Sequence, residues 1–327
     1  MSGSRGAQRA SGKPPVLYVV VPCYNEQDAL PRTARALSDA LTSCPDISPK
    51  SRVLLVDDGS SDKTWETIVS LAEDPAFGSL FTGISLAHNR GHQAALLAGL
   101  TEALERGCDC AISMDADLQD DPAVIPQMLT EYDRGAEIVF GVRSDRGTDT
   151  RFKRGTARAF YRLMGLLGVE LVADSADCRL MGRRALAALS EYEEENLFLR
   201  GIVPSLGFRT AEVRYERAPR VAGESKYPLS KMVTFALEGI TSFSTVPIRL
   251  VALSGVLFLV VAVAMLIWAI VASFLGVTVP GWSSLMVSLW FIGGAVMLSL
   301  GIVGEYVGKC YLEAKRRPRW HVAERLP

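Results

Sequence analysis

Residues 16–26 read VLYVVVPCYNE, an apolar and largely β-branched run that ends abruptly in polar side chains. The run predicts a buried strand at 16–21, and the residues after it predict a helix at 27–41. The same alternation continues along the chain, with strands expected at 53–56, 82–86, 111–114, 138–142 and 209–215 and helices at 64–71 and 92–105. Alternation of this kind predicts an α/β domain with a largely parallel sheet and helices on both faces.

Polar and acidic residues follow three of the expected strands. The first strand runs into Pro22, Tyr24 and Glu26, and the second runs into Asp57 and Asp58. Ligands of α/β sheets bind beyond the carboxyl ends of the strands, so these segments should converge on one rim. Tyr24 offers a stacking face to a base, and the carboxylates can accept hydrogen bonds from a base or a ribose. Polar turns that bind nothing remain the alternative.

The third acidic segment, DADLQDD at residues 115–121, is a candidate metal site. Carboxylates that converge repel one another unless a cation lies between them. Asp115, Asp117 and the amide oxygen of Gln119 are hard ligands that suit Mg²⁺ or Mn²⁺ bound together with substrate phosphates. Turn or helix-cap aspartates are the alternative. The position directly after a strand, beside two other polar strand ends, favours the metal.

The segment HNRGHQ at residues 88–93 contains two histidines four residues apart. A zinc site would need further ligands, and no H-E-x-x-H pattern accompanies them, so we assign no metal to His88 and His92. Asn89 and Gly91 precede the expected helix at 92–105. We expect this loop to lie near phosphate at the helix N-terminus.

Residues 250–304 contain no charged side chain and divide at the sequence GVTVPG, residues 276–281. The two parts, 250–275 and 282–304, are each long enough to span a hydrocarbon core of ~30 Å. A buried hairpin of a soluble protein is the alternative. Arg249 precedes the first part, and basic residues between 309 and 319 follow the second. The positive-inside rule then places both termini and the α/β domain in the cytoplasm, on a multi-pass protein of the cell membrane.

The flanking segments complete the expected organisation. Residues 1–15 read as a disordered tail, 16–228 as the α/β domain, 229–249 as an amphipathic interface helix and 305–327 as a basic cytoplasmic tail. Between 143 and 162 the chain is basic, with Arg154, Arg158 and Arg162 on one helical face. Beside membrane spans, such a face favours contact with anionic headgroups over a merely solvated helix. Nucleic acid is not expected as a partner.

These motifs, taken in order, resemble a known family. PCYNE (22–26), DDGSSD (57–62) and DADLQD (115–120) resemble glycosyltransferase family 2 enzymes of the Rossmann-like GT-A fold. The succession continues through HNRGHQAALLAGL (88–100), DCRLM (177–181), VAGESKY (221–227) and GEYVG (304–308). It is similar to polyprenyl-phosphate glycosyltransferases, above all the bactoprenol (undecaprenyl-phosphate) glucosyltransferases, and more distantly to dolichol-phosphate mannose synthases. The resemblance covers about residues 16–320.

The resemblance implies roles for individual residues of this chain. It implies nucleotide-sugar contacts at Pro22, Tyr24, Glu26, Asp57, Asp58 and Asp115. It implies a divalent metal on the donor diphosphate, held by Asp117 and Gln119 with Asp115 adjoining. It implies an acceptor-phosphate site at Arg143, Arg154 and Lys226. It also implies catalytic roles for Asp115, Asp117, Asp177 and Arg143.

The implied reaction transfers a sugar, with inversion, from a nucleotide-sugar to polyprenyl phosphate at the cytoplasmic membrane face. Glucose from a UDP-sugar and undecaprenyl phosphate are the first candidates, and we expect a homo-oligomer. A polyprenol-phosphate mannose synthase that uses GDP-mannose is the nearest alternative. A non-catalytic membrane scaffold is an alternative of another class. A processive polysaccharide synthase is disfavoured because the chain lacks a Q-x-x-R-W pattern.

Overall fold

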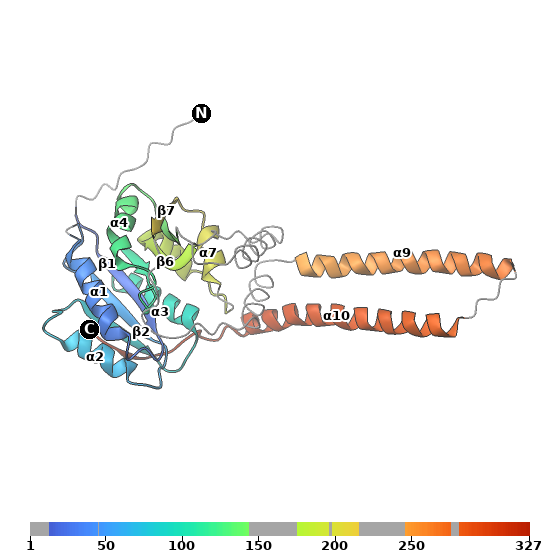
Figure 1. Ribbon diagram of the computed structural model, residues 1–327, viewed down its shortest axis with the longest axis horizontal. Coiled ribbons are helices and arrows are strands. Elements are labelled where there is room, and N and C mark those ends of the chain that lie inside the picture. Colours follow the sequence, from blue (N-terminus) through green and yellow to red (C-terminus); the bar gives the residue numbers. More distant parts are fainter. Residues whose placement is uncertain (1–12, 45, 144–174, 196–197, 216–245, 276–280) are drawn as a thin grey trace, which may run out of the picture. The chain divides into compact units, whose positions relative to one another are not determined.

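The computed structural model describes residues 13–44, 46–143, 175–195, 198–215, 246–275 and 281–327. The chain divides into two compact units (Figure 1). The first contains the described residues up to 215 together with 317–327, and the second contains residues 246–316. The amphipathic helix expected at 154–162 lies outside the described residues, as do Arg154, Lys226 and residues 229–245 of the interface helix expected at 229–249. Residues 246–249 of that expected helix are instead the start of a longer helix, Val246–Phe274.

The first unit is built on a mixed sheet that, in the described residues, has the strand order β7-β5-β6-β4-β1-β2-β3-β8. The strands are β1 (Leu17–Cys23), β2 (Arg52–Asp57), β3 (Phe81–Leu86), β4 (Cys110–Ser113), β5 (Ile138–Arg143), β6 (Ser175–Gly182), β7 (Thr210–Tyr215) and β8 (Val322–Arg325). Neighbouring strands are parallel from β3 through β2 and β1 to β4, and again between β5 and β7. β6 and β8 run antiparallel to their neighbours. The expected parallel sheet therefore holds for the centre, while these two strands make the flanks mixed.

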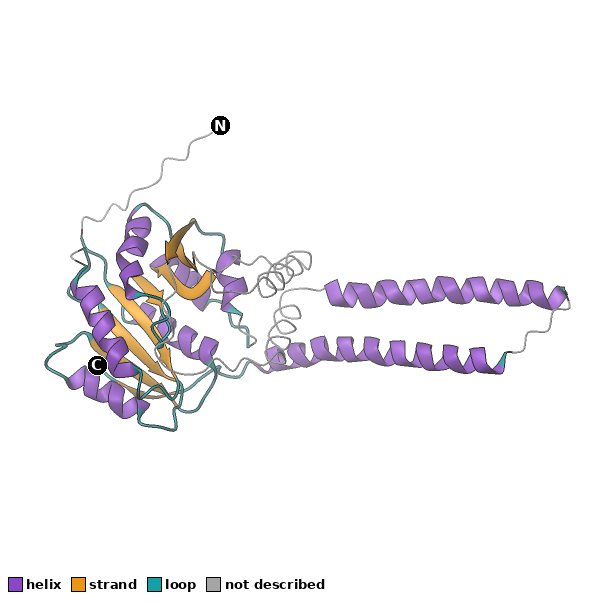
Figure 2. Ribbon diagram, in the orientation of Figure 1, coloured by secondary structure: helices purple, strands orange, loops and turns teal. Residues whose placement is uncertain are grey.

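Helices cover both faces of this sheet (Figure 2). One face carries α1 (Leu30–Thr42), α2 (Thr64–Glu73), η1 (Pro122–Val124) and α4 (Ile125–Asp133). The other carries α3 (His92–Glu105) and α6 (Arg183–Ser190), and the short helix α7 (Leu199–Ser205) follows them in the chain. β1 is buried along its whole length because both of its faces are covered. A Cβ on Gly99 of α3 would lie 2.4 Å from Val20 of β1, so glycine permits this close helix–sheet contact.

The strand register brings the acidic segments together at one edge. β1 lies between β2 and β4 and is parallel to both. Cys23, the last residue of β1, is opposite Asp57, the last residue of β2, while Ser113 ends β4 on the other side. The loops that begin after these residues therefore leave the sheet side by side, as expected from the sequence.

The second unit consists, in its described part, of α9 (Val246–Phe274) and α10 (Trp282–Lys315). Both contain segments long and apolar enough to cross a membrane, and these segments are not buried in the protein. Phe258 and Phe291 pack edge to face with their ring centroids 5.7 Å apart. The two expected apolar helices are thus present. α10 runs beyond the expected end at Gly304 to Lys315, where Arg316 terminates it in a left-handed conformation (φ 45°).

Residues 317–327, which were expected to belong to a basic tail, are part of the first unit. They carry β8, which pairs with β3. No strand was expected here because β8 is short and three of its four residues are exposed. Exposed strands lack the apolar alternation by which a strand is recognised.

Candidate active site

The loops after β1 and β2 are interlocked by hydrogen bonds. The backbone N–H of Asn25 donates to Ser60 Oγ at 3.0 Å, and Asn25 Oδ1 accepts from the N–H of Ser61 at 2.9 Å. Asn25 adopts a left-handed conformation (φ 55°), which asparagine tolerates better than most residues. The ring of Tyr24 stays about half exposed beside this junction, 48% by area. The geometry therefore leaves part of this aromatic ring open to solvent, and the binding of a base there stays a prediction.

Asp57 and Asp58 are both buried and both bind protein groups. Asp57 Oδ2 accepts from Ser85 Oγ at 2.8 Å. The two carboxylate oxygens of Asp58 accept from the backbone N–H groups of Arg90 and Gly91 at 2.7 and 2.9 Å. Burial raises the pKa of Asp58, and these two hydrogen bonds oppose the rise. Asp58 thus ties the end of β2 to the loop before α3, a structural task that the sequence did not reveal.

Gly59 is required at this junction by two separate features. Its φ of +63° lies in the left-handed region, and a Cβ would lie 2.6 Å from the carbonyl carbon of His88. The turn after β2 and the loop before α3 are therefore in backbone contact. No larger residue fits there without a shift of the main chain.

Replacement of Gly59 by alanine should lower the free energy of unfolding by about 3 kcal/mol, from backbone strain and the contact with His88. Gly78→Ala is the matched control, because Gly78 has a similar φ of +59° but open space where the methyl group would lie. The control should cost only about 1 kcal/mol. Thermal or denaturant unfolding of the two variants measures the difference. Equal losses would show that the close approach to His88 contributes nothing.

The loop after β4 is held by contacts that leave two carboxylates at the rim. Thr33 Oγ1 of α1 donates to the carbonyl of Ala116 at 2.6 Å, and the N–H of Gln119 donates to Asp117 Oδ1 at 3.1 Å. Leu118 between them is left-handed (φ 54°). Asp115 and Asp117 are partly exposed, whereas Gln119 is buried. The turn is thus built from the residues that were assigned to a metal from the sequence.

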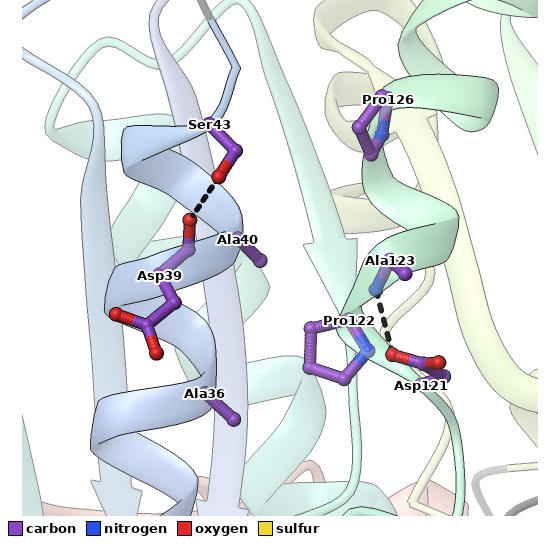
Figure 3. Close-up of a pocket in the computed structure, with 8 residues that line it drawn as sticks. All are labelled: Ala36, Asp39, Ala40, Ser43, Asp121, Pro122, Ala123 and Pro126. Carbon is purple, nitrogen blue, oxygen red and sulfur yellow. Dashed lines mark hydrogen bonds between the residues drawn. The ribbon is translucent and has the colours of Figure 1, made fainter.

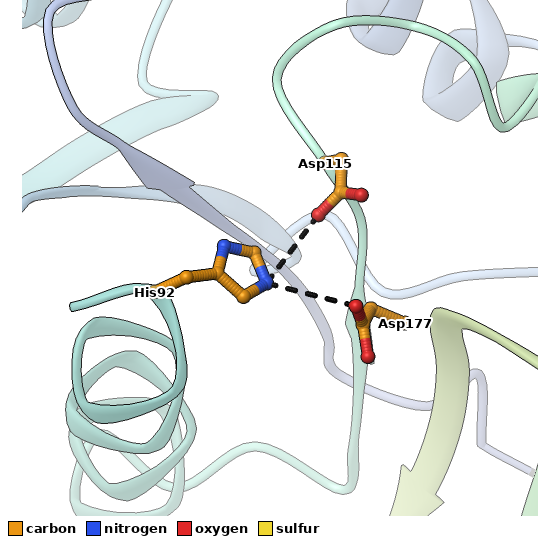
Figure 4. A group of neighbouring side chains, drawn as sticks. All are labelled: His92, Asp115 and Asp177. Atoms are coloured by element: carbon orange, nitrogen blue, oxygen red, sulfur yellow. Dashed lines mark ion pairs between the residues drawn. The ribbon is translucent and has the colours of Figure 1, made fainter. Parts of the chain in front are cut away.

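Asp115 lies in a strongly negative environment. Burial, together with the neighbouring carboxylates of Asp177, Asp120 and Asp117, raises its pKa to about 6, and His92 opposes this rise. His92 Nε2 lies 3.6 Å from Asp115 Oδ1 and 3.9 Å from Asp177 Oδ2 (Figure 4). One ligand atom from each of these three residues lies within 4.8 Å of the others, so the group can hold a metal ion. No metal was expected at His92 from the sequence, because its partners come from the end of β4 and from β6, far away in the chain.

Asp177 of β6 is fixed by two arginines. Arg200 of α7 donates to both of its oxygens, from Nε at 3.0 Å and from Nη2 at 2.8 Å. Arg179 Nη2 donates to Oδ1 at 3.0 Å. Burial would raise the pKa of Asp177, but the hydrogen bonds and charges of Arg200 and Arg179 outweigh it and lower the pKa well below its usual range. Asp177 is therefore an ionised carboxylate that is already paired with two guanidinium groups.

A chain of hydrogen bonds places α7 beside α3 and β6. The buried Arg179 donates from Nη1 to the carbonyl of Leu199 at 3.2 Å. The N–H of Leu199 donates to Gln93 Oε1 in the first turn of α3 at 2.8 Å. These contacts orient the next residue, Arg200, toward Asp177. Arg200 was not predicted as a site residue, because no local pattern marks it in the sequence.

Two further predicted site residues, Pro22 and Arg143, lie in strands of the sheet. Pro22 is in β1 opposite Val56, and Arg143 ends β5 opposite Tyr215. The Tyr215 hydroxyl donates to Asp120 in the loop after β4, which brings the end of β7 to the acidic rim. A groove of about 360 Å³ opens between α1 and the η1–α4 segment (Figure 3). None of the residues assigned to the site lines this groove.

Comparison with known proteins finds matches over most of the chain. A model of the family "Glycosyl transferase family 2" matches residues 18–189, more than half of the chain. The chain is 50% identical over 312 residues to the uncharacterized glycosyltransferase YkoT of Bacillus subtilis, covering 94% of this chain and 91% of that protein. It is 38% identical over 311 residues to the bactoprenol glucosyl transferase of Shigella phage SfV, covering 93% and 97%.

Among solved structures, mannosyl-3-phosphoglycerate synthase from Rubrobacter xylanophilus is 17% identical, with a TM-score of 0.49 over 68% of this chain and 72% of that one. The α/β unit, with its mixed sheet and its acidic edge, has the GT-A-like fold that the sequence implied. Both the family match and the relatives cover the strands that carry this edge. The chain therefore belongs to glycosyltransferase family 2.

Proposed function

We propose that the chain transfers a sugar from a nucleotide-sugar to a polyprenyl phosphate at the cytoplasmic face of the membrane. UDP-glucose and undecaprenyl phosphate are the first candidates for donor and acceptor. One observation carries the proposal: the carboxylate-bearing segments after β1, β2 and β4 leave the sheet at one edge, in a chain that also has two apolar helices. The relatives named bactoprenol glucosyl transferase, which align with 93% of the chain, support the acceptor class.

The acidic edge fits a divalent cation. Asp115 is destabilised as a carboxylate by burial and by three neighbouring carboxylates, and a bound cation would relieve both effects. Asp117 and Gln119 would hold Mg²⁺ or Mn²⁺ together with Asp115, and His92 and Asp177 lie close to Asp115 as further candidate ligands. When bound, such an ion neutralises charge on the diphosphate that leaves.

The protein groups would then position the reactants. The acceptor oxygen belongs to a phosphate that is already ionised near neutral pH, so no strong base is needed. The state of Asp177 supports this, since two arginines keep it ionised and bound. Asp177 is therefore assigned as a fixed counter-ion rather than a proton acceptor. Tyr24, Glu26 and the Asp57–Asp58 pair would bind the nucleotide.

The decisive test supplies the full-length protein in membranes with polyprenyl phosphate and a panel of radiolabelled UDP- and GDP-sugars. We expect radiolabel in the lipid phase with one of these donors. We also expect this labelling to be lost when EDTA removes divalent cations. Transfer from GDP-mannose alone would favour the mannose synthase. No labelling from any donor would favour a non-catalytic scaffold. Labelling that EDTA does not affect would show that transfer needs no divalent metal.

We also propose that both termini and the catalytic unit are cytoplasmic and that the protein is a homo-oligomer. The orientation rests on Arg249 before the apolar part of α9 and on the basic residues that follow the apolar part of α10, with an uncharged turn between the helices. The oligomer is an expectation that rests on the resemblance to the family.

Arg154→Ala and Lys226→Ala should each reduce transfer to polyprenyl phosphate about ten- to hundredfold, because each removes a charge-assisted contact with the acceptor phosphate. Donor binding should change much less. Lipid-phase radiolabel measures transfer, and calorimetry measures donor affinity. If donor affinity falls in step with transfer, these residues serve the diphosphate and the acceptor site lies elsewhere.

A further inference from the structure

The outer edge of the catalytic sheet is formed by a segment that follows the second apolar helix in the chain. β8 pairs antiparallel with β3 along this edge. Two backbone hydrogen bonds extend the pairing: the N–H of Ala87 donates to the carbonyl of His321 at 2.9 Å, and the N–H of Leu326 donates to the carbonyl of Gly83 at 2.8 Å. β3 is therefore held up to the residue at which the 87–91 loop begins.

Side chains at the C-terminal end of α3 also bind this segment. Glu102, which is buried, lies between two guanidinium groups, with Arg106 Nε at 2.9 Å and Arg325 Nε at 3.1 Å. Arg106 Nη2 also donates to the carbonyl of Leu326 at 2.9 Å. Each carboxylate oxygen of Glu102 accepts from one of these groups, so loss of either arginine removes the bond to one oxygen. β8 is thus joined to α3 as well as to β3.

The 87–91 loop connects this edge to the candidate active site. It starts at Ala87, and its last two residues, Arg90 and Gly91, donate their N–H groups to Asp58. The next residue is His92, whose ring approaches Asp115. A shift of Ala87 would therefore be passed along the loop to both the Asp58 contact and His92.

We propose that residues 319–327 form a strap that positions the 87–91 loop and, through it, the nucleotide side of the donor site. The ligand, a nucleoside diphosphate sugar, rests on the proposed function; the hold of the strap on the loop rests on the contacts themselves. The alternative is an edge strand that only stabilises and protects the sheet. Such a strand could be loosened without disturbing the loop.

The test uses the full-length protein in detergent and two variants. Arg325→Ala removes the contact with Glu102, and a chain that stops after Trp320 removes β8. Ala323→Ser is the matched control, because Ala323 is exposed in the same strand. Hydrogen–deuterium exchange reports on the amides of Arg90 and Gly91, and calorimetry measures the binding of UDP-glucose and GDP-mannose.

Arg325→Ala should speed exchange of these two amides and weaken binding of the nucleotide-sugar about tenfold, and the shortened chain should do so more strongly. The control should match the wild type. If the amides of Arg90 and Gly91 exchange at the wild-type rate in Arg325→Ala while the unfolding temperature falls, the proposed strap is wrong. β8 is then an edge strand that only stabilises the sheet. If the shortened chain does not fold, Arg325→Ala decides alone. If the wild type binds neither nucleotide-sugar, the proposed function fails, while amide exchange still decides the strap.

Discussion

Replacement of Asp115 by asparagine is expected to abolish sugar transfer and, in the presence of a chelator, to stabilise the folded protein at neutral pH. The loss of transfer should be at least about 10³-fold, because the variant removes a charge from the position where the cation and the diphosphate would meet. The gain in stability follows from the raised pKa of Asp115, about 6 against an ordinary value of 3.8. Asparagine has nearly the same shape and no charge.

The sign of the stability effect depends on pH. A carboxyl whose pKa is raised on folding stabilises the protein below its unfolded pKa, and this contribution is lost as the pH rises through about 6. At pH 7 the ionised carboxylate therefore opposes folding, by on the order of 1–3 kcal/mol. Asp115→Asn should relieve that cost at pH 7 and give little advantage at pH 4.

Thermal unfolding in EDTA at both pH values, beside lipid-phase radiolabel, measures the two effects. Asp121→Asn is the matched control: Asp121 is exposed in the same loop and caps η1 by accepting from the N–H of Ala123, which asparagine can also do. It should keep near-normal transfer and stability. If Asp115→Asn destabilises the protein at pH 7, Asp115 is a structural residue and the negative edge is not a strained binding site.

Replacement of Arg200 by alanine should reduce transfer about a hundredfold. Of the two arginines on Asp177, Arg200 is the one that bonds both carboxylate oxygens. Without it, the pKa of Asp177 rises toward its ordinary value, and the carboxylate loses the contact that fixes its orientation. Because the pKa is depressed in the folded protein, Asp177 stays ionised in acid; the variant should therefore lose its remaining activity at a higher pH than the wild type.

The pH profile of transfer separates this role from simple destabilisation. Arg200→Lys should be intermediate, since lysine keeps the charge but cannot form the two parallel hydrogen bonds. Arg184→Ala is the control, because Arg184 of α6 is largely exposed and pairs with Glu137 at 3.6 Å, and surface pairs contribute little. It should stay within about twofold of the wild type. An unshifted acid limb in Arg200→Ala would show that Asp177 does not depend on Arg200 for its charge.

Much of the fold was predictable because local patterns of apolar and polar residues indicate the individual strands and helices. The segment at 16–21 is an uninterrupted apolar run and the segment at 92–105 is largely apolar, and the structure has β1 at Leu17–Cys23 and α3 at His92–Glu105. The apolar stretches at 250–275 and 282–304 form α9 and α10. Parallel pairing of β1 with β2 and β4 then brings the acidic segments to one edge. The individual strands and helices depend on residues close together in sequence, so their apolar runs and polar boundaries indicate them.

Two strands could not be predicted for a physical reason. β6 begins with small and polar residues and buries Arg179, which bonds Asp177 and the carbonyl of Leu199. β8 is mostly exposed and depends on pairing with β3 and on Glu102. Both strands exist because distant parts of the chain supply their partners. The local strand propensity of the residues does not indicate a strand in such cases.

By itself, the sequence determined which residues could carry charge at the edge of the sheet, because strand ends and acidic motifs are visible in one dimension. Only the tertiary structure decided how those charges are used. It placed His92 beside both Asp115 and Asp177 and paired Asp177 with Arg200. It also bound Asp58 to the backbone of the 87–91 loop. The pKa of each carboxylate is set by burial and by charges within a few ångströms, and those neighbours come from strands and helices far apart in the chain.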